Sequence, residues 1–159
     1  MVRLNKIKLS TLSDDTVKDC IKPYEDYETL SESQRSTLKI PLWLGIYISI
    51  ALSEQRAPDF ANKLELVKGY WDNRLLEASK TTDSSQNQLV ISELLHQMIN
   101  KSKLSVSENS LNNVSLMSLK TLRSVGLITS QNKQISFRHQ ALFDYQVGVR
   151  LFNAAQTSF

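Results

Sequence analysis

Few residues have types and spacings that could support chemistry. The chain contains two histidines, His96 and His139, and a single cysteine, Cys20. One cysteine excludes an internal disulfide and a cysteine-based zinc site, and the sequence has no H-E-x-x-H motif. Serines are abundant, but none stands in a nucleophile elbow. We therefore expect no metal site, no catalytic residue and no enzymatic activity of the chain by itself.

Glycine usage argues against a phosphate-cradling loop within this chain. Only four glycines occur, at positions 45, 69, 126 and 148, and no G-x-x-x-x-G-K-[ST] motif is present. The longest apolar run, residues 40–52, is shorter than the roughly 18 residues that a membrane-spanning helix needs. No apolar leader segment follows Met1. With a single cysteine, these features predict a cytoplasmic protein with no membrane partner.

Charge is unevenly distributed along the chain. The net charge is +3 overall, yet residues 101–159 hold seven basic and two acidic residues, a net charge of +5. Residues 1–100 hold 12 basic and 14 acidic residues, a net charge of −2. Two regions with different partners are therefore expected, and the basic one is suited to phosphate.

Helical periodicity and capping residues dominate residues 1–80. Residues 2–9 alternate apolar and polar side chains and predict a short strand or extended arm. Ser13 and Ser31 stand at helix starts, the second in a capping box with Gln34. Pro41 is predicted to open an almost wholly apolar helix over residues 42–55, which would be central in the core. A fourth helix is expected from Pro58 onward.

Residues 79–88 are polar and are interpreted as a linker, so the domain boundary is predicted between residues 80 and 81. Helices are expected over residues 89–101 and 114–125, the second stopped by Gly126. Residues 102–110 are expected to be loop. Strands around residues 127–129 and 134–137 and a last helix over 140–154 complete the order of a winged-helix unit.

Three stretches, in order along the chain, carry a resemblance to a known family. Residues 7–15 resemble the exit strand of a nucleotide-binding core followed by the L-S-x-(E/D) start of a helical lid. Residues 39–44 resemble the G-x-P-L-x-L motif of that lid, and residues 126–145 resemble a wing hairpin with the M-H-D motif that opens the last helix. The chain thus resembles the lid and winged-helix region of STAND-class P-loop NTPases, the NACHT and NB-ARC relatives of AAA+ proteins. The fold class implied is mainly α, with a helical lid bundle (1–80) followed by a winged-helix subdomain (81–159) with a small β-hairpin.

The resemblance implies roles for three residues. Pro41 matches the lid proline that lies against the adenine ring. His139 matches the histidine that contacts the diphosphate of ADP, and Arg138 would add positive charge there. Lys39 stands in place of the lid glycine, and Arg138 and Gln140 stand in place of the methionine and the aspartate of M-H-D.

The function that the resemblance implies is regulatory and non-catalytic. The chain would be the C-terminal part of an NTPase switch, and it would contact ATP or ADP only when joined to a P-loop core, its expected partner. ADP would hold the module closed through His139, and exchange for ATP would release it and permit homo-oligomerisation.

Two other interpretations remain open. A winged helix also binds DNA, and here the helix over residues 114–125 would present Lys120 and Arg123, with Lys133 on the wing. The third alternative is a helical protein-interaction module with a groove for a partner helix. Its aromatic lining would come from Trp43, Phe60, Tyr70 and Trp71.

Overall fold

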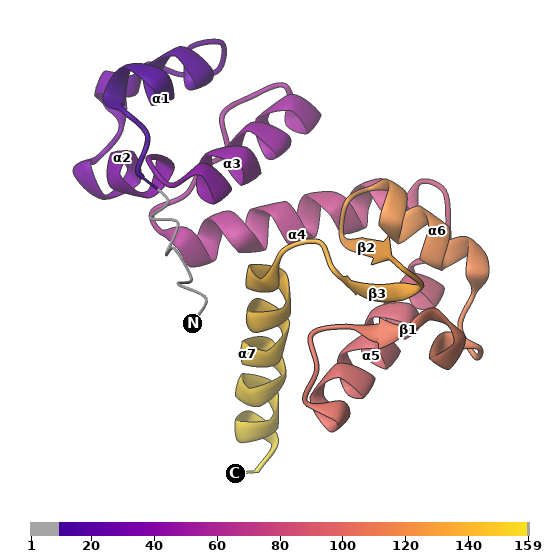
Figure 1. The fold of residues 1–159 in the computed structure, drawn as a ribbon. Helices are drawn as coiled ribbons and strands as arrows, with labels where there is room; N and C mark the ends of the chain where they lie inside the picture. Colours follow the sequence, from indigo (N-terminus) through magenta and orange to yellow (C-terminus); the bar gives the residue numbers. More distant parts are fainter. Residues whose placement is uncertain (1–9, 159) are drawn as a thin grey trace, which may run out of the picture. The chain divides into compact units, whose positions relative to one another are not determined.

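The computed structural model of the chain describes residues 10–158, and these form seven α-helices, two short 3-10 helices and three strands (Figure 1). The fold is mainly α with a small antiparallel sheet in its C-terminal half, as the sequence predicts. The predicted strand or arm over residues 2–9 lies outside the described residues. So does the first part of the 7–15 stretch.

The chain divides into two compact units, residues 1–66 (unit 1) and 67–159 (unit 2). The division falls within one helix, α4 (Lys63–Ser79), between Leu66 and Val67. The predicted boundary between residues 80 and 81 lies just beyond the C-terminal end of α4 at Ser79. Each unit has its own buried apolar residues.

Unit 1 is built from α1 (Asp14–Ile21), η1 (Tyr27–Thr29), α2 (Glu32–Leu38), α3 (Pro41–Glu54) and the first turn of α4. The Ser13 side chain accepts a hydrogen bond from the Thr16 N–H and caps α1. Ser31 and Gln34 form the predicted capping box of α2. Pro41 occupies the first turn of α3, where its missing N–H costs no helical hydrogen bond.

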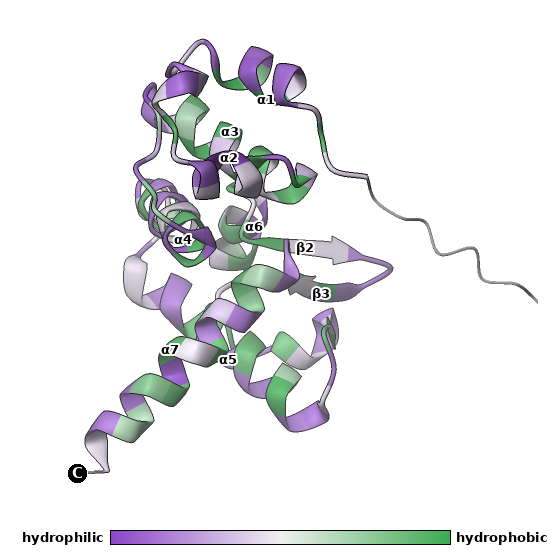
Figure 2. Cartoon of the chain, turned by 90° about the vertical axis from the view of Figure 1, so that its left-hand side faces the viewer, coloured by the Kyte–Doolittle hydropathy of each residue, from purple (hydrophilic) through white to green (hydrophobic). Residues whose placement is uncertain are grey.

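The apolar helix α3 supplies much of the core of unit 1 (Figure 2). It is not buried on every side as predicted, because Leu42 is 39% exposed and Leu52 57% exposed. The fully buried residues of unit 1 include Val17, Ile21, Leu38, Ile46, Tyr47, Ile50 and Phe60. Among residues 10–158, no single helix is long and apolar enough to cross a membrane. The pair α2 and α3 meets that length and composition only together, across a 100° bend.

Helix α4 begins later than the predicted start at Pro58. It starts at Lys63, because the Asn62 side chain accepts a hydrogen bond from the Glu65 N–H, and the Glu65 carboxylate accepts one from the Ala61 N–H. The first bond satisfies an N–H group that the first turn of a helix leaves without a partner, and the second ties the residue before Asn62 to the same turn.

Unit 2 continues from α4 through α5 (Ser84–Lys101), β1 (Val106–Ser107), η2 (Glu108–Leu111), α6 (Leu116–Ser124), β2 (Ile128–Gln131), β3 (Gln134–Phe137) and α7 (Gln140–Thr157). The strands form one antiparallel sheet in the order β1-β3-β2. This is the winged-helix arrangement, with β2 and β3 as the wing. The strand β1 was predicted as loop, because two residues are too short for an alternating pattern. Its position comes from pairing with β3, Val106 opposite Ile135.

The linker between α4 and α5 is shorter than predicted. Helix α5 starts at Ser84 rather than near Leu89, because the Asp83 carboxylate accepts hydrogen bonds from the N–H groups of Ser85 and Gln86. That cap turns a polar stretch into the first turn of a helix. The core of unit 2 draws on α4, α5, α6, the sheet and α7 through Trp71, Val90, Leu94, Leu95, Met98, Leu122, Leu127, Phe137 and Leu142.

Candidate functional site

His139 lies at the point where the wing ends and the last helix begins. It is the N-cap residue of α7, with extended backbone and no capping hydrogen bond from its side chain. The preceding Arg138 N–H donates to the Leu127 carbonyl at 2.9 Å, which holds the end of β3 against the start of β2. Burial, and then the positive charge of Arg138, lower the pKa of the half-buried His139 ring below its ordinary value. The ring is therefore neutral at neutral pH, with one nitrogen able to donate.

Tyr70 of α4 anchors this region. Its ring stands edge-on to the His139 ring with 6.0 Å between centroids, and its hydroxyl donates to the Gly126 carbonyl at 2.7 Å. The Arg74 guanidinium lies 4.9 Å from the centre of the same ring. Tyr70 thus links the end of α6 to the start of α7. Arg74 was not predicted here, because residues 74 and 139 are far apart along the chain and no spacing relates them.

The three residues assigned to nucleotide by resemblance fall in different units. His139 and Arg138 are neighbours in unit 2, and Arg138 is exposed. Pro41 belongs to unit 1, exposed at the first position of α3. Lys39, where the lid motif has glycine, forms an ion pair with Asp14 at 2.7 Å.

The three residues assigned to DNA lie on two elements of the winged helix. Lys120 and Arg123 are exposed on α6, one turn apart on the same face. Lys133 lies in the β2–β3 turn, where it and Asn132 both adopt positive φ. Its carbonyl accepts a hydrogen bond from the Glu108 N–H at 2.9 Å.

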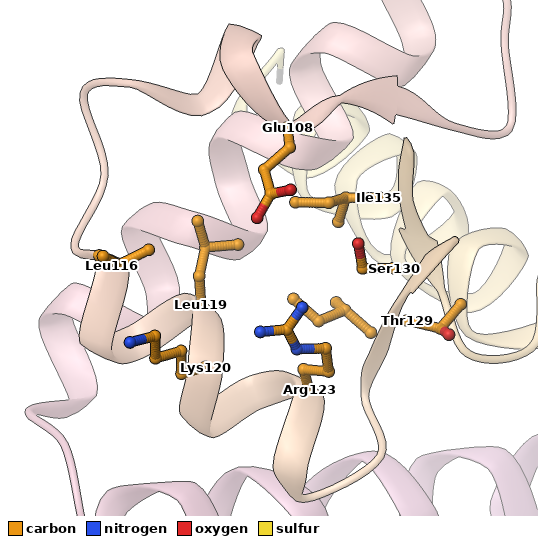
Figure 3. A pocket seen from close by; sticks show the side chains of 9 residues that line it. Glu108, Leu116, Leu119, Lys120, Arg123, Thr129, Ser130 and Ile135 are labelled. Carbon is orange, nitrogen blue, oxygen red and sulfur yellow. The ribbon is translucent and has the colours of Figure 1, made fainter. Parts of the chain in front are cut away.

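A narrow crevice runs between α6 and β2 (Figure 3). Its floor is apolar, made by Leu119, Ile128 and Ile135, and Lys120 and Arg123 stand at its α6 side. Glu108 lines it from η2, and Lys133 does not line it. Its free volume of about 10 Å³ has room for one water molecule or the tip of one apolar side chain. The crevice is therefore no site for a nucleotide or another small molecule.

The exposed face of α6 carries large apolar side chains beside its cations. Leu116 is 62% exposed and Met117 61% exposed, both in the first turn. The N-terminal residues of a recognition helix are those that contact base edges. A leucine and a methionine at that place offer no hydrogen bond to a base and disfavour the DNA-binding alternative.

The prediction that aromatic side chains line a groove for a partner helix is wrong. Phe60 is 1% exposed, and Tyr70 and Trp71 are each 4% exposed, so all three are core residues. Trp43 is half-buried, with the Lys63 ammonium 5.9 Å from the centre of its ring. Aromatic residues at helical spacing here fill the interiors of the two units, where burial is favourable.

A polar hollow in unit 1 is lined by charged side chains, several of which are paired with one another. Asp14 pairs with Lys39 and accepts a hydrogen bond from the Tyr27 hydroxyl, and these partners lower its pKa. Arg35 lies over the Tyr27 ring and bonds Glu28. Within residues 10–158, no group of three or more His, Cys, Asp or Glu side chains is placed to hold a metal ion.

No protein-family model matches the chain, and no curated protein sequence matches it.

Proposed function

We propose that the chain is the lid and winged-helix part of a STAND-type nucleotide switch, a regulatory, cytoplasmic element without a catalytic site of its own. The observation that supports this most is the position of His139. It is separated from the wing by a single residue, occupies the N-cap position of α7, and its side chain makes no capping hydrogen bond. The M-H-D histidine of the resembled family stands at the same place in its motif.

The start of α7 is suited to a diphosphate. The first turn of a helix presents N–H groups without helical partners and the positive end of the helix dipole. The neutral ring of His139 can donate one hydrogen bond to a phosphate oxygen, and the exposed Arg138 adds a full positive charge. Phosphate binding would favour protonation of His139 and so reverse the lowering of its pKa.

Direct contacts of Tyr70 would carry a change at the nucleotide from His139 to the end of α6. The Tyr70 hydroxyl bonds the Gly126 carbonyl, and the ring of Tyr70 meets His139, so a movement of His139 changes the packing at the end of α6. In this proposal the P-loop core that supplies ATP or ADP is the partner of the chain, Pro41 lies against the adenine, and release of ADP permits oligomerisation. A switch of this kind depends on contacts that differ between the two nucleotides.

The first test is the size of the native polypeptide, measured by immunoblot of its source with an antibody raised against this segment. We expect a band well above 18.1 kDa, the mass of this chain. A single band at that mass would overturn the proposal, because no nucleotide core would be joined to the chain.

The second test is release of labelled ADP from the native full-length polypeptide. His139→Ala removes one hydrogen bond to a charged phosphate, worth roughly 1.5–3 kcal/mol, so release should accelerate about tenfold to a hundredfold. His96→Ala is the matched control, since His96 is exposed on α5 and bonds only Asn100 among the described residues. Equal release rates for the two variants would contradict a role of His139 in holding nucleotide.

A further inference from the structure

The exposed face of α6 combines apolar and basic side chains in one patch, which we call the α6 face: Leu116, Met117, Lys120 and Arg123. Leu116, Lys120 and Arg123 follow each other at positions i, i+4 and i+7 and therefore form one stripe along the helix. Met117 lies beside them. The opposite face of α6 is buried through Ser118, Leu119, Thr121 and Leu122.

The stripe borders the crevice described above. Leu116 forms part of its lining, so an exposed leucine continues into an apolar floor (Figure 3). The floor is nearly closed in the chain as described, with room for the end of one side chain. A docked segment would therefore insert a single apolar side chain between α6 and β2 and cover Leu116 and Met117.

The cations of the α6 face are available to a partner. Among residues 10–158, neither Lys120 nor Arg123 forms an ion pair or a side-chain hydrogen bond. Glu108, which also lines the crevice, pairs with neither of them. The surrounding residues 101–159 carry a net charge of +5, so the field at this surface attracts acidic groups.

We propose that the α6 face and its crevice bind a short acidic segment of a partner protein that carries one or two large apolar side chains. The apolar side chains would cover Leu116 and Met117, and the tip of one of them would enter the crevice. The acidic groups would pair with Lys120 and Arg123. Exposed Leu116 and Met117 favour a peptide over DNA, because a nucleic acid would leave both facing phosphates and water. This surface lies on α6 and needs no nucleotide at His139.

The test is a selection of short random peptides displayed on phage, with the purified 159-residue chain as bait. We expect the enriched peptides to combine Asp or Glu with Leu, Ile, Phe or Trp. The same selection on Lys120→Glu/Arg123→Glu should enrich Lys and Arg in place of the acidic residues, because the charge at the rim is reversed.

Fluorescence anisotropy then measures one enriched peptide and a random-sequence DNA duplex at low salt. Lys120→Glu/Arg123→Glu and, separately, Leu116→Ser/Met117→Ser should each weaken peptide binding about tenfold or more. The matched control Lys101→Glu/Lys103→Glu makes the same change in net charge on residues that do not line the crevice, and it should weaken binding far less. Circular dichroism of each variant verifies that it is folded.

Three outcomes would overturn the proposal. The first is a selection that shows no enrichment of acidic residues. The second is peptide binding that survives both α6 variants or falls equally with the control variant. The third is that the DNA duplex binds and no peptide does, and that duplex binding is lost in Lys120→Glu/Arg123→Glu. This result would assign the α6 face to DNA.

Discussion

Gly126 ends α6, and its replacement offers a sharp test of the packing between α4 and the wing. Its φ is +86°, in the region that residues with a Cβ rarely adopt. The following Leu127 N–H donates to the Leu122 carbonyl at 3.0 Å, which completes the turn that stops the helix. A Cβ at Gly126 would lie 3.0 Å from the Tyr70 hydroxyl, the same group that bonds the Gly126 carbonyl.

Gly126→Ala should therefore destabilise unit 2 through two effects. The left-handed backbone costs a residue with a Cβ about 1–2 kcal/mol. Displacing the Tyr70 hydroxyl would weaken a hydrogen bond worth roughly 0.5–1.5 kcal/mol. Together we expect a loss of about 2 kcal/mol in the free energy of unfolding, and a fall in melting temperature of roughly 10 °C for a domain of this size.

The assay is thermal and urea unfolding followed by far-UV circular dichroism, with Gly148→Ala as the matched control. Gly148 lies within α7, and a Cβ there meets nothing within 4 Å. Because alanine is the better helix former, Gly148→Ala should stabilise the chain by about 0.5–1 kcal/mol. The same glycine-to-alanine change should thus lower the free energy of unfolding at Gly126 and raise it at Gly148.

A double-mutant cycle separates backbone strain from the close contact. Tyr70→Phe removes the hydroxyl that would lie 3.0 Å from the new Cβ. If that close contact matters, Gly126→Ala should lower the free energy of unfolding by less in the Tyr70→Phe background. An equal loss in both backgrounds would assign the whole effect to backbone conformation. If Gly126→Ala unfolds like the unaltered chain, or is stabilised as Gly148→Ala is expected to be, the structural account of this turn is refuted.

Two further predictions concern local contacts. Asp83→Ala removes the side chain that caps α5 and should lower the free energy of unfolding by about 1 kcal/mol in urea titrations. Asp59→Ala, an exposed carboxylate outside the helices, is the control, and an equal loss in both variants would contradict the capping role. In unit 1, Lys39, and then Tyr27, lower the pKa of Asp14 in the folded chain, so this interaction stabilises the fold above the ordinary aspartate pKa and is lost as pH falls through the folded pKa. Lys39→Met should therefore be less stable than the unaltered chain at neutral pH and approach it in acid, whereas a difference independent of pH would exclude the pairing.

Local capping signals were the most predictable features of the chain. Ser13, Ser31 with Gln34, Pro41 and Gly126 each act on groups within a few residues, so their types and order suffice to place helix ends. The same physics was overlooked at two other helix starts. At Asn62 the helix was predicted to begin too early, and at Asp83 a polar stretch interpreted as linker forms the first turn of α5. The wing was predictable as well, since strand, turn and strand are adjacent in sequence.

The sequence by itself therefore determined the helices, the hairpin and the winged-helix order, because these depend on short-range hydrogen bonds and on apolar periodicity. The tertiary structure alone decided which apolar residues are buried. Trp71, Tyr70 and Phe60 are core, whereas Leu116 and Met117 are exposed. It also decided the meeting of Tyr70, Gly126 and His139, which come from three separate elements. Such contacts depend on how distant segments pack, and no spacing along the chain records them.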